Sequence, residues 1–245
     1  MRLYCTDLDN TIICGQEPEF FGTCVAIKNN KKASFMTMES YDKFIEIIGN
    51  IMTLPITTRC EKSYNNIYLK KFFKYALVDN GAILISENAK ECENWIKESR
   101  QIISPYKKEF EEIRKLIEVY GYKEKWGSEF VLDYVNKEIT EEKKNELKKK
   151  LENYGNFLIN IGKTSFVCTY NKLSKGENIK RFAQKYGYEI YITTGDNKED
   201  ESMFCESVHS FGKNNAKINL KSTDKLDFCN KVINEVYELL TKEKR

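Results

Sequence analysis

The stretch Asp7-Leu8-Asp9-Asn10-Thr11 directly follows the short apolar run Leu3-Tyr4-Cys5, which predicts a buried strand. Side chains alternate along an extended strand, so the Asp7 and Asp9 carboxylates are expected to project to the same side, and a backbone carbonyl stays free to reach a cation. Two carboxylates in this arrangement predict a site for a metal ion and a phosphate group. The alternative interpretation of the same pattern is a turn capped by an aspartate side chain.

Composition narrows the classes of protein to which the chain can belong. Its 245 residues with 41% apolar content predict a globular fold large enough for a core and an insertion. The 40 basic and 37 acidic residues are mixed along the chain, so no nucleic-acid partner is expected. No run approaches the roughly 20 apolar residues of a membrane span and no signal peptide is evident, which favours a cytoplasmic protein without a membrane partner. A single histidine, His209, and eight scattered cysteines argue against a zinc cluster, a disulfide scaffold or a Ser-His-Asp triad.

Predicted strands and helices alternate through both ends of the chain, which is typical of a doubly wound parallel α/β sheet. Before residue 86 the patterns predict a hairpin turning at Asn29-Asn30, a helix capped by Ser40, and strands over 52–57, 75–78 and 82–85. After residue 171 they predict a helix opened by Ser174, strands over 189–194 and 208–211, and a closing helix over 228–239. Ligands of such sheets bind beyond the carboxyl ends of the strands.

The middle of the chain, residues 86 to 171, has a different character. A helix is expected after Ser104-Pro105 and another after Thr140, with strands over 130–135, 157–161 and 165–170. We therefore expect an α/β core of residues 1–85 and 172–245, with residues 86–171 as an inserted α+β cap domain.

Polar motifs follow the predicted strand and helix ends in a fixed order: Asp7-x-Asp9-x-Thr11, Thr57-Thr58-Arg59, Leu173-Ser174-Lys175-Gly176 and Thr194-Gly195-Asp196-x-x-x-Asp200. In this order they resemble the four motifs of the haloacid dehalogenase (HAD) superfamily of phosphohydrolases. Asn80-Gly81-Ala82 also resembles the sequence before the αββαββ cap of subclass IIB, which includes Cof-like and sucrose-phosphate-phosphatase-like proteins. The resemblance implies a HAD Rossmann-like core with that cap.

The resemblance also implies roles for individual residues. Asp7 is expected as the nucleophile that forms an aspartyl-phosphate, and Asp9 as the general acid and base. The expected phosphate-binding residues are Thr57, Thr58 and Lys175, and alignment through Arg59 favours Thr57 over Thr58. The expected ligands of Mg²⁺ are Asp7, the Asp9 backbone carbonyl and Asp196, with Asp200 farther out or bound through water. The residues expected to meet the substrate are Arg59, Lys125, Trp126 and Lys163.

Two departures from the family pattern leave details open. Thr58 stands where glycine is usual, and Glu199 stands where asparagine is common, so the roles of Asn197 and Glu199 are not assigned. The expected function is a Mg²⁺-dependent phosphomonoesterase acting on a small phosphorylated metabolite, with sugar phosphates first. One alternative is a sugar phosphomutase, whose second phosphate site could come from Lys123, Lys125 and Lys163. The other is a catalytically silent HAD-like binding module, which the presence of both aspartates disfavours.

Overall fold

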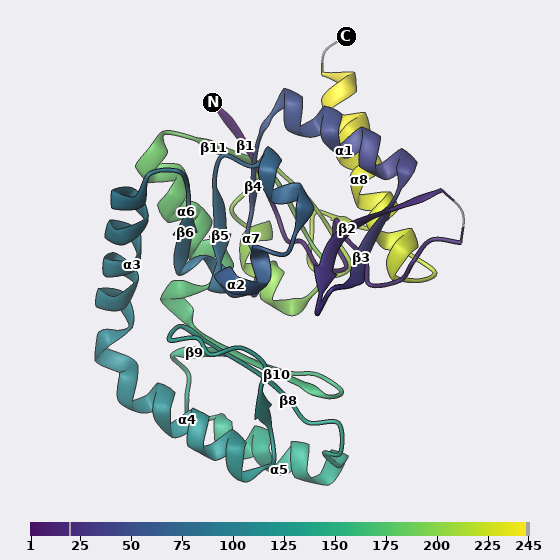
Figure 1. Cartoon of the computed structure of the whole chain (residues 1–245). Helices are drawn as coiled ribbons and strands as arrows, with labels where there is room; N and C mark the ends of the chain where they lie inside the picture. The colour runs from purple at the N-terminus through teal and green to yellow at the C-terminus, as the bar shows by residue number, and fades with distance from the viewer. Residues whose placement is uncertain (20, 244–245) are drawn as a thin grey trace.

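The computed structural model describes residues 1–19 and 21–243 and arranges them as a core and a cap (Figure 1). The core is built on a five-stranded parallel sheet with the strand order β13-β12-β11-β1-β4. These strands are β1 (Arg2–Thr6), β4 (Met52–Pro55), β11 (Glu189–Gly195), β12 (His209–Gly212) and β13 (Ile218–Asn219). The start of β1 lies at the edge of the core farthest from the cap (Figure 1).

The sheet is covered on both faces, as the apolar strand sequences predict. Tyr4 of β1 packs on one face with residues of α1 (Met38–Asn50) and α8 (Lys225–Lys242). Leu3 and Cys5 point to the other face, where they pack with residues of α6 (Lys175–Tyr186), α7 (Glu201–Phe204) and α3 (Ala89–Ile103). The doubly wound parallel sheet is therefore confirmed.

The expected hairpin is present as β2 (Gly22–Lys28) and β3 (Lys31–Thr37), which pair antiparallel. Asn29 and Asn30 both have positive φ, the conformation that a two-residue hairpin turn requires. The expected helix cap at Ser40 is wrong. Thr37 caps α1 by accepting a hydrogen bond from the Ser40 backbone, and the Ser40 hydroxyl donates to Asn230 of α8, because the helix begins as soon as β3 ends.

Short elements connect β4 to the cap. They comprise α2 (Glu61–Tyr64), a 3₁₀ turn over Tyr68–Phe72, and the antiparallel pair β5 (Ala76–Val78) and β6 (Ile83–Ile85). Thr57 continues from β4 and pairs through its backbone with Leu77 of β5. The strands predicted over 75–78 and 82–85 are thus present as β5 and β6 and pair as a hairpin.

The cap is a four-stranded antiparallel sheet with the order β7-β8-β10-β9. Helices α4 (Lys107–Val119) and α5 (Glu141–Leu151) cover the face away from the core, so the other face is turned toward the core (Figure 1). The strands are β7 (Lys123–Glu124), β8 (Val131–Val135), β9 (Phe157–Ile161) and β10 (Ser165–Tyr170).

Helix α3 is an element that the sequence patterns did not predict. Ser104 and Pro105 lie in a 3₁₀ turn that joins α3 to α4, instead of opening the first helix of the insertion. Trp95 of α3 is fully buried in the core cluster that contains Leu3, so this helix packs on the core. The boundary of the cap at residue 86 stays a prediction. Within residues 1–19 and 21–243, none of the helices is long and apolar enough to span a bilayer.

Candidate active site

Parallel pairing brings the polar motifs to one edge of the sheet. Thr6 at the end of β1 is in register with Thr194 of β11 and with Pro55 of β4. The carboxyl ends of parallel strands lie at the same edge, so Asp7, which follows Thr6, meets the residues that follow the other two strands.

Asp7 lies at the floor of the site and is 4% exposed. Its Oδ1 accepts a hydrogen bond from Lys175 Nζ at 2.6 Å, and its Oδ2 accepts one from Thr11 Oγ1 at 3.0 Å. Burial raises the pKa of Asp7. Burial alone would lower the pKa of Lys175, but the neighbouring Asp200 and Asp7 carboxylates raise it, so Lys175 remains a cation beside Asp7.

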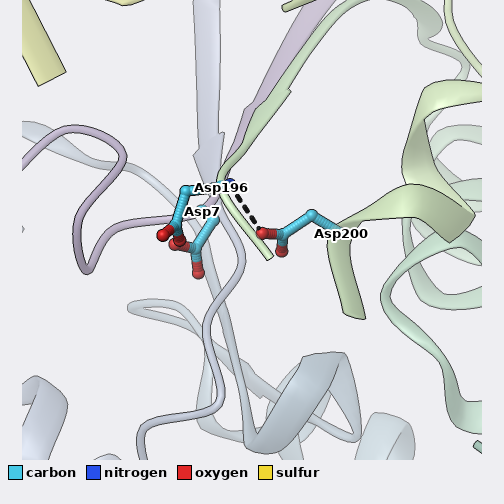
Figure 2. A group of neighbouring side chains, drawn as sticks. All are labelled: Asp7, Asp196 and Asp200. Atoms are coloured by element: carbon cyan, nitrogen blue, oxygen red, sulfur yellow. Dashed lines mark hydrogen bonds between the residues drawn. The ribbon is translucent and has the colours of Figure 1, made fainter. Parts of the chain in front are cut away.

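Asp196 and Asp200 complete a cluster with Asp7 in which one carboxylate oxygen of each lies within 4.8 Å of the others. Figure 2 shows Asp7 and Asp196 side by side, with Asp200 approaching from the opposite direction. Asp200 is fully buried, and its Oδ2 accepts hydrogen bonds from the Asp196 and Asn197 backbones, each at 2.9 Å. Its Oδ1 accepts from Lys175 Nζ at 2.6 Å. Asp196 is partly exposed and Asp7 lines the active-site cavity, whereas Asp200 is fully buried, so Asp7 and Asp196 are better placed than Asp200 to meet a cation that enters from solvent.

The charges in this cluster fit a divalent metal ion. Its three carboxylates face two ammonium groups, those of Lys175 and Lys213, and Lys213 Nζ lies 3.0 Å from Asp196 Oδ2. One negative charge remains uncompensated. Burial and the nearby Asp200 raise the pKa of Asp196 to about 6, as expected where carboxylates gather without enough positive charge. An all-oxygen donor set of this kind suits Mg²⁺.

Asp9 has a different environment. Both of its carboxylate oxygens accept hydrogen bonds from Arg59, Oδ2 from Nε and Oδ1 from Nη2, each at 2.6 Å. A bidentate pair of this geometry fixes the orientation of the carboxylate. Arg59, expected to meet the substrate, instead holds Asp9 in place.

A cavity of about 370 Å³ lies between the core and the cap. Its core side includes Asp7, Asp9, Asn10, Thr58, Lys175 and Lys225. Its cap side comes from the sheet face turned toward the core, where Val167 of β10 is in register with Asp133 of β8 and Asn160 of β9. We call Asp133, Val167 and Asn160 the cap row.

Two polar contacts extend from the cap row. Lys125 Nζ forms an ion pair with Asp133 Oδ1 at 2.7 Å. Asn160 Nδ2 donates to Glu199 Oε1 at 2.9 Å, which joins the cap to the core across the cavity. Glu199, whose role the sequence left open, thus closes one side of the pocket.

This chain resembles known proteins in its fold but not detectably in its sequence. No family model and no curated protein matches this sequence. Solved structures do match over nearly the whole chain. The sucrose-phosphatase from Synechocystis sp. PCC6803, in complex with sucrose and phosphate, is similar with a TM-score of 0.67 at 14% identity, covering 98% of this chain and 99% of that chain. The fold is the HAD-like fold with an inserted cap.

Two further structures share this HAD-like fold. The C-terminal domain of trehalose-6-phosphate phosphatase from C. albicans has a TM-score of 0.59 at 13% identity, covering 98% of this chain and 92% of that chain. A haloacid dehalogenase-like hydrolase from Bacillus subtilis has a TM-score of 0.52 at 15% identity, with coverage of 98% and 92%. The expected fold class is confirmed.

Of the remaining residues expected in the site, some line the cavity and others lie outside it. Thr58 lines the cavity, whereas Thr57 is buried and its hydroxyl accepts from the Arg59 backbone, so the geometry favours Thr58 for contact with a phosphoryl group. Trp126 does not line the cavity, but its side chain contacts Asp133 of the cap row, and its ring centroid lies 5.4 Å from Lys28 Nζ of the β2–β3 hairpin. Lys163 is exposed in the β9–β10 turn, outside the cavity lining.

Asp133, Asn160 and Lys225 are among the pocket residues that sequence reasoning missed. Asp133 carried a usable signal, because an acidic residue interrupts the apolar run 130–135. Asn160 and Lys225 carried none, since their place depends on strand register and on where α8 begins.

Proposed function

We propose that this protein is a Mg²⁺-dependent phosphomonoesterase that acts through an aspartyl-phosphate on a small phosphorylated metabolite, with a sugar phosphate as the favoured class. The observation that carries the proposal is the Asp7 carboxylate, held by Lys175 and Thr11 at the floor of a pocket that Asp9 also lines. The similar structures include phosphatases of sucrose phosphate and trehalose 6-phosphate by name, which supports a phosphorylated sugar.

The reaction divides into two displacements at phosphorus. In the first, an Asp7 oxygen attacks phosphorus and the ester oxygen leaves with a proton from Asp9. In the second, water attacks phosphorus while Asp9 accepts a proton, which releases inorganic phosphate and restores Asp7. Lys175 and Thr58 line the pocket, which supports a role for both in holding the phosphoryl oxygens.

A magnesium ion held by Asp7, Asp196 and the Asp9 backbone carbonyl would supply positive charge to the phosphoryl oxygens. Lys175 meanwhile keeps its position through Asp200, whose carboxylate is fixed by two backbone N–H groups. Asp200 thus positions Lys175, and Lys175 in turn orients the Asp7 carboxylate.

The cap supports a small polyol as the leaving group. The cap row and Lys125 present carboxylate, amide and ammonium groups above the aspartates, and such groups suit sugar hydroxyls. The phosphomutase alternative lacks comparable support. Of Lys123, Lys125 and Lys163, the cavity lining includes Lys125, which is already paired with Asp133.

The proposal is tested with purified protein and a panel of sugar phosphates together with p-nitrophenyl phosphate. We expect phosphate release with Mg²⁺, loss of activity with EDTA, and recovery when Mg²⁺ is restored, because the carboxylate cluster otherwise repels an anionic ester. The Asp7→Asn variant is the matched control and should stay folded by circular dichroism but inactive. Full activity after thorough chelation would remove magnesium from the mechanism, and full activity of Asp7→Asn would refute the nucleophile.

A further inference from the structure

Lys225 differs from the other lysines of the active-site pocket. Lys175 is paired with Asp7 and Asp200, and Lys125 is paired with Asp133. Lys225 lines the same pocket at its exposed rim, and within residues 1–19 and 21–243 no carboxylate lies within ion-pair distance of it. Its ammonium group is therefore a cation available to a ligand.

The position of Lys225 in its helix does not account for a lysine. It is the first residue of α8, directly after the N-cap Asp224. The N-terminus of a helix carries partial positive charge, so a lysine there is disfavoured by about 0.3–1 kcal/mol at low ionic strength. The next turn is firmly anchored, because Phe228 and Cys229 are buried in the core. The backbone of Lys225 is thus fixed beside the pocket.

The remaining charges of the pocket limit where an anion can bind. Asp9, Asp133 and Glu199 line it as well, and each would repel a negative group that is not balanced by a cation. On the core side of the pocket, the Lys225 ammonium group would attract a second negative group of a bound ligand. A neutral polyol would leave this ammonium group only hydrated.

We propose that Lys225 binds a second anionic group on the substrate, so that the preferred substrates are phosphate esters whose leaving group carries a carboxylate or another phosphate. This inference rests on the proposed phosphatase function and names its substrate class more narrowly. Lysine acts as a point charge and accepts either group, so the two are separated by experiment.

The test compares Lys225→Gln with Lys221→Gln, a control that removes an exposed lysine just before α8 and outside the pocket. One substrate pair is 6-phosphogluconate and sorbitol 6-phosphate, which differ only by a carboxylate or a hydroxymethyl group at the far end. The other pair is fructose 1,6-bisphosphate and fructose 6-phosphate. We expect Lys225→Gln to lower kcat/KM about tenfold for the more anionic member of at least one pair and less than about twofold for its partner. Lys221→Gln should change neither.

The pair that responds identifies the second anionic group as a carboxylate or a phosphate. An equal loss on all four substrates would mean that Lys225 serves the transferred phosphoryl group, and no loss on any would mean that it binds nothing. Either result overturns the inference.

A binding measurement separates this inference from the proposed function. Calorimetry on Asp7→Asn, with and without Lys225→Gln and with Mg²⁺ present, gives the Kd of both six-carbon pairs without turnover. We expect about tenfold weaker binding of the responding anionic ester alone. If the native protein hydrolyses nothing but this difference persists, the phosphatase proposal fails, while Lys225 still recognises the second anionic group of a bound ester. Hydrolysis without any such difference overturns the Lys225 inference alone.

Discussion

Two aspartates one residue apart occupy contrasting surroundings. Asp7 is buried and held by an ammonium group and a hydroxyl, whereas the Asp9 side chain is 45% exposed and held by the planar fork of Arg59. A fixed, buried carboxylate suits attack on phosphorus, while a carboxylate in contact with solvent suits proton exchange. The difference in environment matches the two roles that the proposed mechanism assigns.

Asp79 is a buried carboxylate outside this machinery. It has a positive φ of 49° and is 4% exposed, facing Ser128 and Glu129 of the cap and Glu61 of the core. Burial raises the pKa of Asp79 from 3.8 to about 7. The folded state therefore holds a proton that the unfolded state releases between about pH 4 and pH 7, so this group lowers the free energy of unfolding as the pH rises through that window.

We predict that Asp79→Asn stabilises the protein by about 2 kcal/mol at pH 8 and by little at pH 4, because the amide needs no proton to stay neutral. Denaturant unfolding at a series of pH values measures the difference from the native protein. Asp42→Asn, which removes an exposed carboxylate of α1, is the control and should show no such trend. A stabilisation that does not grow with pH would show that Asp79 is ionised at pH 4.

At the scale of elements, the start of α6 depends on close packing against α7. A Cβ added at Gly176 would collide with the backbone carbonyl of Ser202. We predict that Gly176→Ala lowers the free energy of unfolding by more than about 2 kcal/mol and impairs activity, since α6 carries Lys175. Gly49→Ala in α1 meets no neighbour and should be neutral or stabilising by up to about 1 kcal/mol. Equal stability of both variants in urea unfolding would contradict the packing argument.

The cap sheet should govern the choice of substrate. Lys125 lines the pocket and Lys163 does not, so we predict that Lys125→Gln changes the relative rates among sugar phosphates while Lys163→Gln leaves them unaltered. p-Nitrophenyl phosphate has no sugar group for the cap to recognise, so both variants should cleave it at nearly the native rate. Initial rates on each ester give the ratios. A uniform slowing by Lys125→Gln on every ester, with the fold intact, would contradict a role in specificity.

Across the whole molecule, the sequence predicted the elements that are determined by local patterns of apolar and turn residues. Apolar runs ending in polar motifs located β1, β4 and β11, and the Asn29-Asn30 turn located the hairpin. Helix α3 was not predicted because its sequence is mostly polar. Its buried Trp95 can be recognised as a core residue only from its packing against β1. The caps of helices depend on where the preceding strand ends, which is why Thr37 replaced Ser40.

The residues of the site also fall into those that local sequence patterns predict and those that depend on tertiary structure. Three of the motifs follow the ends of parallel strands, so their convergence could be predicted from the sheet alone, whereas Lys175 begins α6 and reaches the site through the packing of that helix. The cap row depends on the register of three antiparallel strands, and the pairing of Arg59 with Asp9 joins segments 50 residues apart. Lys225 joins the pocket only once α8 is packed on the sheet. Such relations arise from tertiary structure and have no local signature.

Trapping the phosphorylated intermediate shows whether Asp7 carries the phosphoryl group. The Asp9→Asn variant should form the aspartyl-phosphate from an activated ester but hydrolyse it slowly, because it lacks the base that activates water. After mixing with p-nitrophenyl phosphate and Mg²⁺ and quenching in acid, mass spectrometry of the peptide that contains Asp7 should show one added phosphoryl group, absent from Asp7→Asn/Asp9→Asn. If the native protein releases phosphate but the label lies on another residue, or Asp9→Asn yields no labelled peptide, Asp7 is not the nucleophile.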